Sequence, residues 1–363
     1  MTVPVTMRQI AERADVSIGT VSHVVNGTSR VRPKLRERVL EAIRSLGFQP
    51  SALAQGLRTN RTRMLGMIIP DISNPFFPSV VRGAEDVAFK HSYRVVLCNT
   101  DNDPAKESLY FTELRSYRTA GLLIIPAAGS DIASALKPGT PGIPPVVCLD
   151  RRPEGWTGDS VVVANELGAY GATQYLIEAG HRNLAVITGP TKLENSVERL
   201  KGFRKALKDK NLTLPAEFVQ EAAFDTRSGF QAAKRLLKML PLPTAIFACN
   251  DLMALGALHA IHEMNLRCPE DISLIGFDNL EFCEYTNPPL TSVYQPGYQL
   301  GAAAANLLLD RVNGMHDRAK RILLETELKI RSSVLPLGNV RALSTSRKAS
   351  IQARANKKLV TAG

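Results

Sequence analysis

Apolar residues at the start of the chain recur every three or four positions, which is the spacing of short amphipathic helices. Residues 6–26 predict two such helices joined by a tight turn, and the hydroxyls of Thr6 and Ser17 are placed to cap their N-termini. A third helix follows Pro33 and ends at Gly47. The first two helices have the spacing of a helix-turn-helix unit.

The pattern changes at Met64, where short apolar runs begin to alternate with helix-length amphipathic segments. Such alternation is the βαβ signature of parallel sheets. The predicted fold is therefore an α/β core of two doubly wound parallel-sheet subdomains, preceded by a small all-α head. Strands are predicted at residues 65–69, 94–98, 121–125, 146–149, 184–188, 245–248 and 272–276, and helices at 76–92, 165–179, 195–210, 227–239 and 251–265.

These patterns divide the chain into segments. We expect a helix-turn-helix head over residues 1–49, a hinge helix and linker over 50–62, a first core subdomain over 63–163 plus 296–322, a second core subdomain over 164–295 plus 323–338, and a basic, disordered tail over 339–363.

Charged residues are distributed unevenly along the chain. The overall composition, with 44% hydrophobic and 22% charged residues, is ordinary for a globular protein. Of the net charge of +11, residues 1–63 carry eleven basic and four acidic side chains, and residues 339–363 carry six basic and no acidic side chains. A basic head on a near-neutral body is typical of nucleic-acid binding.

The sequence lacks the features that mark several other classes of protein. No apolar run approaches the length of a membrane span, and no signal-peptide core precedes the first helix, so a cytoplasmic location is expected. The five cysteines are widely spaced without a C-x-x-C pair, which favours reduced thiols over disulfides or metal ligands. Nucleotide-loop and nucleophile-elbow motifs are absent, so we expect no enzyme activity, no metal and no cofactor.

Five motifs together are typical of one known family. They are Val16-Ser17-x-x-Thr20-Val21-Ser22-x-Val24-x-Asn26, Leu53-Ala54-x-x-Leu57, Asp71-x-x-Asn74-Pro75-Phe76-Phe77, Asn250-Asp251-x-Met253-Ala254 and Gly276-Phe277-Asp278. Through these motifs, residues 6 to about 337 resemble the lactose-repressor (LacI/GalR) family of bacterial transcription regulators, whose core resembles periplasmic sugar-binding proteins.

The resemblance implies that the second helix enters the major groove of DNA. Ile18, Gly19 and His23 occupy the family's base-reading positions. His23 offers a donor to purine acceptors and Ile18 an apolar contact to a thymine methyl, while Gly19 has no side chain to offer. The alternative is that Ile18 belongs partly to the core and His23 is simply solvated. The full set of predicted DNA contacts is Ser17, Ile18, Gly19, Thr20, Ser22, His23, Asn26, Arg36 and Leu57.

Within that set, Thr20, Ser22, Asn26 and Arg36 suit phosphate contacts, which position the head without reading sequence. Leu57 matches the leucine that family members wedge into a minor-groove base step from a hinge helix. This chain departs from the family at Gly56, which weakens an isolated helix by about 1 kcal/mol relative to Ala.

The resemblance also implies an effector site between the core subdomains, with polar groups for sugar hydroxyls and aromatic faces for the ring. The matching residues are Asn74, Phe76, Phe77, Asp150, Arg151, Arg199, Phe224, Asn250, Asp278 and Gln295. Ile125 stands where an Asn is expected. Taken singly, Phe77 could be core, Arg199 and Asp278 could form a structural ion pair, and Arg151 could pair with Glu154.

The predicted protein is a sequence-specific repressor. We expect a homodimer on a pseudo-palindromic operator at the bacterial nucleoid, with DNA affinity controlled by a ribose-like sugar or a nucleoside. An acidic or phosphorylated sugar is the rival effector. The alternative function is an exported sugar-binding receptor without DNA binding, which shares the core but has no use for a basic head.

Overall fold

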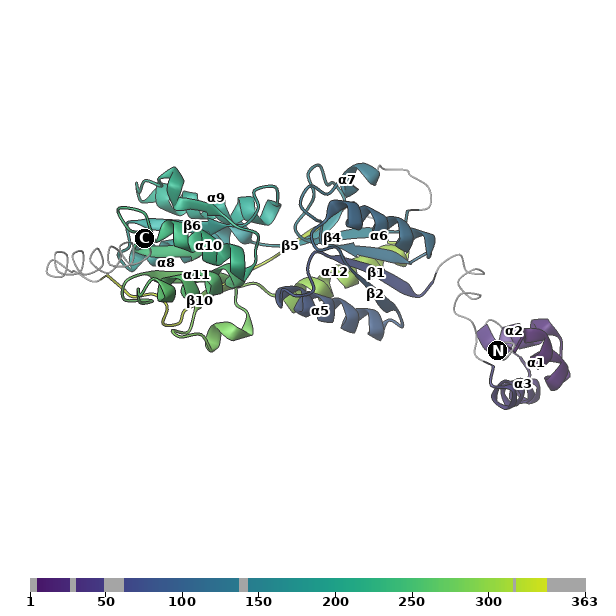
Figure 1. Ribbon diagram of the computed structural model, residues 1–363. Helices are drawn as coiled ribbons and strands as arrows, with labels where there is room; N and C mark the ends of the chain where they lie inside the picture. Colours follow the sequence, from purple (N-terminus) through teal and green to yellow (C-terminus); the bar gives the residue numbers. More distant parts are fainter. Residues whose placement is uncertain (1–4, 27–30, 49–61, 137–142, 316–317, 338–363) are drawn as a thin grey trace. The chain divides into compact units, whose positions relative to one another are not determined.

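The computed structural model describes residues 5–26, 31–48, 62–136, 143–315 and 318–337 (Figure 1). The chain divides into a head, Met1–Thr62, and a body, Arg63–Gly363.

The described part of the head contains three helices, which are α1 (Met7–Ala14), α2 (Ile18–Asn26) and α3 (Pro33–Leu46). Thr6 caps α1 through a reciprocal capping box with Gln9. The Ser17 hydroxyl accepts a hydrogen bond from the Thr20 amide at 3.2 Å, so it caps the start of α2 as predicted.

The three helices of the head enclose a small core of their own. Ile10 of α1, Val21 of α2 and Val39 of α3 are fully buried in it. Arg38 Nη2 of α3 donates to the carbonyl oxygens of Ala14 at 2.6 Å and Asp15 at 3.0 Å, and thereby ties α3 to the turn between α1 and α2. The helix-turn-helix prediction is confirmed.

The body contains two six-stranded sheets. The first has the order β11-β5-β4-β3-β1-β2, and each of its described strand pairs is parallel. Its strands are β1 (Met64–Ile69), β2 (Arg94–Asn99), β3 (Gly121–Ile124), β4 (Val146–Asp150), β5 (Asp159–Val163) and β11 (Arg321–Leu324), and its helices are α5 (Phe76–Lys90), α6 (Pro104–Ser116), α7 (Ile132–Ala135) and α12 (Gly297–Val312).

The second sheet has the order β12-β10-β9-β8-β6-β7 and is parallel except for the antiparallel pair β10 and β12. Its strands are β6 (Leu184–Thr188), β7 (Val219–Glu221), β8 (Ala245–Ala248), β9 (Ser273–Asp278), β10 (Thr291–Tyr294) and β12 (Glu327–Lys329). Its helices are α8 (Asn165–Glu178), α9 (Glu194–Asp209), α10 (Thr226–Leu236) and α11 (Asp251–Glu263), with short 3-10 turns at Ala216–Phe218 and Glu281–Glu284. The predicted fold class is confirmed.

The chain passes between the two sheets three times: after β5, between β10 and α12, and between β11 and β12. The boundary expected between residues 322 and 323 falls inside β11, so the third passage follows Leu324 instead. The segment around it is short and has no turn residue to mark the strand end. With this shift, the division of the body into two subdomains remains our proposal.

In the first subdomain, α5 and α12 pack along each other and approach very closely (Figure 1). A methyl group at Gly301 of α12 would lie 1.9 Å from the carbonyl oxygen of Val80, and one at Gly83 of α5 would lie 2.0 Å from that of Tyr298. Two backbones can come this close only where neither carries a side chain.

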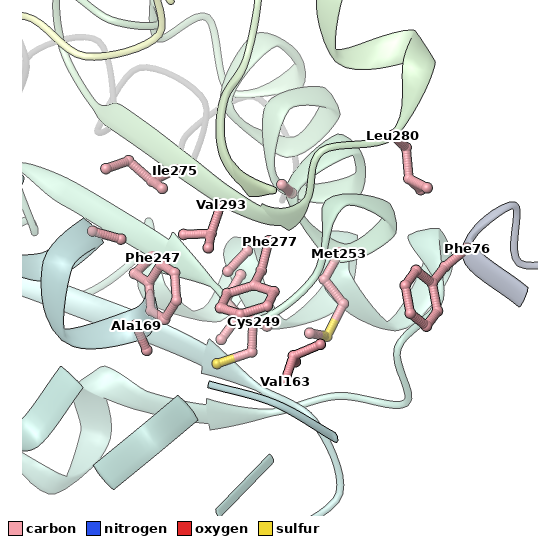
Figure 2. Packing of buried hydrophobic residues seen from close by; sticks show 14 of the residues in the cluster. Phe76, Val163, Ala169, Phe247, Cys249, Met253, Ile275, Phe277, Leu280 and Val293 are labelled. Atoms are coloured by element: carbon pink, nitrogen blue, oxygen red, sulfur yellow. The ribbon is translucent and has the colours of Figure 1, made fainter. Parts of the chain in front are cut away.

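In the second subdomain, a buried aromatic cluster underlies the end of the sheet (Figure 2). Phe203 of α9 stacks on Phe247 of β8 with ring centroids 6.0 Å apart. Phe277 of β9 is fully buried and lies beside Phe247 in Figure 2. This cluster supports the strand ends from which polar side chains emerge.

The close approach of α5 and α12 generates a stability prediction. Gly301→Ala should lower the free energy of unfolding by about 1–3 kcal/mol, because the added methyl group overpacks the helix pair. Gly171 of α8 is the matched control, since a methyl group there meets no other atom within 4 Å. Gly171→Ala should raise stability by about 0.5–1 kcal/mol. Urea unfolding of the full chain measures both changes, and equal effects would contradict the argument.

Candidate functional site

A cavity of about 380 Å³ lies between the two sheets of the body. All ten residues predicted for an effector site line it, so the structure brings together residues from 74 to 295 of the sequence. Several of them stand at the carboxyl ends of parallel strands, including Asp150 of β4 and Asp278 of β9. Ligands of open α/β sheets bind at such strand ends.

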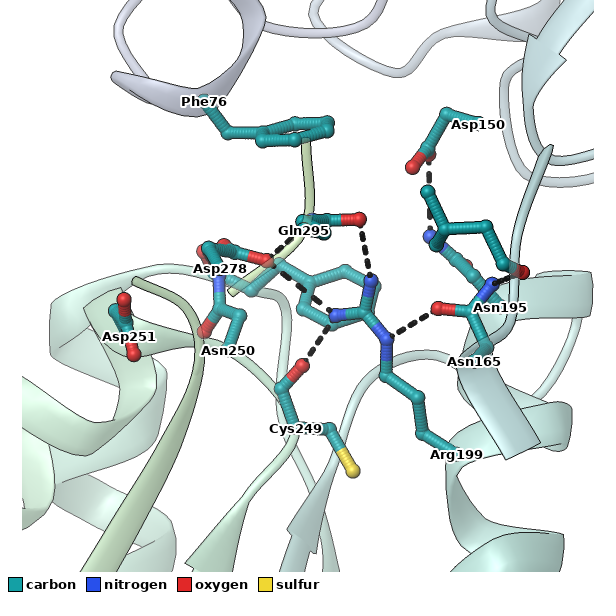
Figure 3. A network of polar contacts seen from close by, with 12 residues as sticks. Phe76, Asp150, Asn165, Asn195, Arg199, Cys249, Asn250, Asp251, Asp278 and Gln295 are labelled. Carbon is teal, nitrogen blue, oxygen red and sulfur yellow. Dashed lines mark hydrogen bonds and ion pairs between the residues drawn. The ribbon is translucent and has the colours of Figure 1, made fainter. Parts of the chain in front are cut away.

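Arg199 of α9 is the centre of the polar network in the second subdomain (Figure 3). Its guanidinium donates to the Cys249 carbonyl oxygen at 2.5 Å and to Asn165 Oδ1 at 2.8 Å. Its Nη1 lies 3.6 Å from a carboxylate oxygen of Asp278, and its guanidinium carbon lies 3.8 Å from the centroid of the Phe277 ring. Arg199 and Asp278 therefore do form the structural ion pair that the sequence left open as an alternative, and both residues line the cavity.

Asp278 closes this network from the end of β9. Its carboxylate accepts a hydrogen bond from Gln295 Nε2 at 2.5 Å, and its backbone has a φ of +115°, which is unfavourable for a residue with a side chain. Burial raises the pKa of Asp278 well above its ordinary value, and the attraction of Arg199 offsets this only in part.

A second charge pair lies on the first subdomain. Arg151 Nη1 is 3.7 Å from Asp150, and its guanidinium also donates to the Pro126 carbonyl oxygen at 2.6 Å and to Asn102 Oδ1 at 3.3 Å. Burial raises the pKa of Asp150 and lowers that of Arg151, because it disfavours the charged form of each side chain. The opposite charge of the partner offsets part of this cost. Arg151 is thus bound to Asp150 and not to Glu154, the partner considered as an alternative.

Aromatic rings line the cavity from both subdomains. Phe76 and Phe77 begin α5 and meet edge to face, with ring centroids 5.4 Å apart. Phe224 has a φ of +64°, and its ring fills the space where a side chain at Gly189 would stand, 2.2 Å away. Phe77 is 7% exposed and packs in the core while also lining the cavity, so the two interpretations of it are compatible.

Two amides of the cavity wall also shape the local backbone. Asn250 Oδ1 accepts from the Met253 amide at 2.8 Å and caps α11, while its Nδ2 donates to the Phe224 carbonyl oxygen at 3.0 Å. Asn74 Oδ1 accepts from the Phe76 amide at 3.0 Å. Both residues hold their neighbouring phenylalanines in place.

Several polar partners of these residues were not predicted from the sequence. Asn165 binds Arg199, Asn102 binds Arg151, and Asn195 Nδ2 donates to Asp150 at 3.2 Å. Asn102 and Asn195 line the cavity themselves. Ile125 stands where the family resemblance leads us to expect an Asn. It belongs to the hydrophobic core and does not appear among the described residues of the cavity wall, so this replacement removes no polar group from that wall.

The predicted DNA contacts in the head lie mainly on the outer side of α2. Ile18 is 52% exposed, which argues against its being part of the core, and Gly19 and His23 are exposed too. Ser17, at the start of α2, and Arg36, on α3, are exposed, whereas Thr20 and Ser22 are partly buried. Asn26 ends α2, but its side chain lies outside the described residues, as do Leu57, the hinge and the tail.

The described residues show no cluster of His, Cys, Asp or Glu suited to a metal ion. Burial raises the pKa of the Cys249 thiol to about 12, so this cysteine beside Arg199 is inert as a nucleophile. Within the described part of the chain, no helix combines the length and apolarity needed to span a membrane.

Comparison with known proteins supports the division into head and body. Residues 6–51 match the family described as bacterial regulatory proteins, lacI family, and residues 173–334 match the periplasmic binding protein-like domain. The HTH-type transcriptional repressor PurR of Histophilus somni (strain 2336) is 37% identical over 332 residues, which cover 92% of this chain and 99% of that protein.

Solved structures give the same result. The lac repressor dimer bound to operator and the anti-inducer ONPF has a TM-score of 0.83 and 29% identity over 92% of this chain and 100% of that one. A LacI family transcriptional regulator from Enterococcus faecium with bound ribose has a TM-score of 0.68 and 32% identity over 76% of this chain and 99% of that one.

The fold and the two sites define a DNA-binding regulator that carries a periplasmic-binding-protein-like effector core. The chain belongs to the LacI family of transcriptional repressors. Its relatives are not enzymes, and their similarity through the head as well as the core decides against a receptor without DNA binding.

The raised pKa of Asp278 generates a prediction about stability. Its contribution is present below the pKa of an unfolded aspartate and is lost as the pH rises through the higher pKa of the folded protein. The free energy of unfolding should therefore fall as the pH rises over this interval. In Asp278→Asn the fall should be smaller, because an asparagine side chain has no proton to lose over this interval.

Urea unfolding of the ligand-free protein between about pH 5 and about pH 8 measures this difference. Asp209 is the control, because hydrogen bonds from Tyr170 and Lys205 lower its pKa, so it stays ionised over this pH range and Asp209→Asn should leave the pH dependence there unchanged. If Asp209→Asn reduced the fall as much as Asp278→Asn does, the assignment to Asp278 would be wrong.

Proposed function

We propose that this repressor senses a neutral, ribose-like sugar, free or as part of a nucleoside, in the cavity of the body. The observation that carries the proposal is the pairing of the cavity's buried charges. Arg199 faces Asp278 and Arg151 faces Asp150, so the wall offers fixed donors and acceptors without an excess buried cation. Such a wall suits vicinal hydroxyl groups, which both donate and accept hydrogen bonds.

The size of the cavity supports a pentose. A cavity of about 150 Å³ holds benzene, which has six heavy atoms. By that proportion the ten heavy atoms of ribose need about 250 Å³. The observed volume of about 380 Å³ accommodates the sugar with room for a substituent or a few waters. The regulator from Enterococcus faecium, which has ribose bound, supports the same class of ligand.

The charges of the cavity disfavour an acidic or phosphorylated sugar. Besides the two charge pairs, Asp71, Asp101 and Asp225 line the cavity. Among the described lining residues, five carboxylates therefore face two guanidinium groups. An anionic ligand would be repelled in this partly dehydrated site unless further cations entered with it.

Calorimetry on the full chain tests this proposal. D-ribose or a ribonucleoside should bind, and ribose 5-phosphate should not. Phe224→Ala should weaken binding at least about tenfold, because it removes an aromatic face that is worth roughly 1.5–3 kcal/mol when covered. Phe89→Ala is the matched control, since Phe89 is 59% exposed on α5 and lies outside the described cavity wall.

Binding of the phosphorylated sugar alone would overturn the choice of effector, while the assignment to the repressor family would stand. Equal loss of affinity in Phe224→Ala and Phe89→Ala would remove Phe224 from the site. Circular dichroism of each variant establishes that folding is retained.

We also propose that α2 reads the operator in the major groove. His23 and Ile18 are exposed on it and suit contacts with base edges, whereas Arg36 on α3 suits a phosphate. We further propose that two chains pair on the two half-sites of an operator at the bacterial nucleoid; the lac repressor, whose solved structure is a dimer bound to operator, supports the pairing. Leu57 stays a proposed minor-groove wedge.

The head generates a prediction about specificity. His23→Ala should relax sequence preference at one symmetric pair of operator positions, at roughly 1–3 kcal/mol per base contact. Arg36→Ala should weaken binding to all sequences alike and reduce the salt dependence by about one counterion. Binding to a randomised operator library at two salt concentrations separates the two effects. A uniform loss in His23→Ala would remove it from the base-reading set.

A further inference from the structure

Beside the cavity, the ion pair of Arg152 and Glu194 joins the two subdomains without belonging to the described cavity wall. Arg152 follows β4 of the first sheet, and Glu194 begins α9 beside the second sheet. The Arg152 amide donates to Glu194 Oε2 at 2.7 Å, Arg152 Nε donates to Oε1 at 2.9 Å, and Nη2 donates to Oε1 as well. The two side chains are 26% and 22% exposed.

The neighbours of this pair are cavity residues on both sides. Asp150 and Arg151 precede Arg152, and Leu193 and Asn195 flank Glu194, and all four line the cavity. Arg152 and Glu194 are absent from its described lining. The pair therefore fixes the distance between two segments that bear cavity residues, without contacting a ligand in the cavity.

We propose that Arg152 and Glu194 form a clasp that holds the two subdomains closed around the effector and so sets effector affinity. Arg152 and Glu194 act as positioning residues. The clasp rests on the proposed function for the identity of its effector, but its effect on closure exists without any ligand.

The geometry gives the clasp more strength than an ordinary surface ion pair. The planar guanidinium of Arg152 donates to both carboxylate oxygens of Glu194, and the Arg152 backbone amide donates to the same carboxylate. Bidentate pairs of this kind, when partly desolvated, are among the strongest charged hydrogen bonds. Glu194 is also the first residue of α9, where the helix dipole favours a negative charge. Two weaker contacts cross in parallel: Asn195 Nδ2 with Asp150 at 3.2 Å, and Arg321 with Glu198 at 3.8 Å.

The effect of the clasp on effector affinity follows from the fraction of molecules that are in the closed form. An effector that contacts both subdomains binds the closed form, so its apparent dissociation constant equals the intrinsic constant divided by the closed fraction. Removing the clasp lowers that fraction. We expect about a tenfold increase in the dissociation constant, which lies between the effects of an exposed ion pair and of a close charge pair at an interface.

A double-mutant cycle on the full chain tests the proposal, with D-ribose as the probe in calorimetry. Arg152→Met and Glu194→Met should each raise the dissociation constant about tenfold, and the double variant should be no worse than either, because both substitutions break one interaction. Arg152→Lys keeps the charge without the planar fork and should fall in between. Lys201→Met is the matched control, since Lys201 on α9 pairs with Glu166 of α8 at 2.8 Å within the second subdomain.

Hydrogen exchange on the ligand-free protein gives a second readout that does not depend on the effector. In Glu194→Met, exchange should accelerate in the segment 151–158 of the other subdomain, because its Arg152 amide loses its acceptor and the cleft opens more often. Lys201→Met should leave this segment unchanged.

Unchanged ribose affinity in both single variants, or effects that multiply in the double variant, would overturn the clasp. Exchange that accelerates only around residue 194 would overturn it too. If the wild-type protein failed to bind ribose, the proposed effector would be wrong and the exchange experiment alone would decide: acceleration in 151–158 supports the clasp, and no change refutes it.

Discussion

The buried guanidinium of Arg199 is the interaction on which the arrangement of the cavity depends. It reaches from α9 to the carbonyl of Cys249 after β8, to Asp278 at the end of β9, and to Gln295 after β10 at 3.5 Å. Three adjacent strand ends are therefore held by one side chain that stacks on the core ring of Phe277. Because a buried charge is stable only while its partners remain, the strand ends and α9 must adopt their positions together.

The same region stores backbone strain. Asp150, Phe224 and Asp278 line the cavity and all have positive φ, a conformation that costs of order 1–3 kcal/mol for a residue with a side chain. The surroundings hold at least two of them in this conformation. Gln295 and Arg199 contact the Asp278 carboxylate, while the Phe224 ring fills the space beside Gly189 and its carbonyl oxygen accepts a hydrogen bond from Asn250 Nδ2. Strain and buried charge thus oppose stability at one place, and the apolar core behind them offsets both.

The sequence predicted those parts of the fold in which local and tertiary preferences agree. The head helices carry caps and a narrow apolar stripe, and most of the central strands are short, bounded apolar runs. The inner strands β5 and β10, the edge strands β7, β11 and β12, and the helices α6, α7 and α12 were not predicted. The three edge strands have three or four residues, and α12 is apolar on most of its surface because it packs against both α5 and the sheet. Such a helix lacks the amphipathic period that marks an exposed one.

The candidate site shows the same limit. Its ten residues could be identified only through their resemblance to a family, since they are spread from residue 74 to residue 295 and no local pattern links them. Their partners were missed for a related reason. Asn165 owes its role to a bond from Arg199, 34 residues away, and Arg152 and Glu194 are separated by 42 residues. The first contact depends on how two helices of one subdomain pack, and the second on how the two subdomains meet. Periodicity along one chain encodes neither.

The connectivity of the chain places a condition on how the effector site communicates with DNA. The linker enters the body at β1 of the first sheet, so within a single chain the head is joined to the first subdomain alone. If closure of the cleft moves the second subdomain relative to the first, the covalent link between the head and the first subdomain does not by itself transmit that movement to DNA. The movement changes DNA affinity only if a second copy of the chain is present, so that closure alters the spacing between the two heads. Dimerisation, known for the lac repressor, is therefore required for the effector to act on DNA by this route.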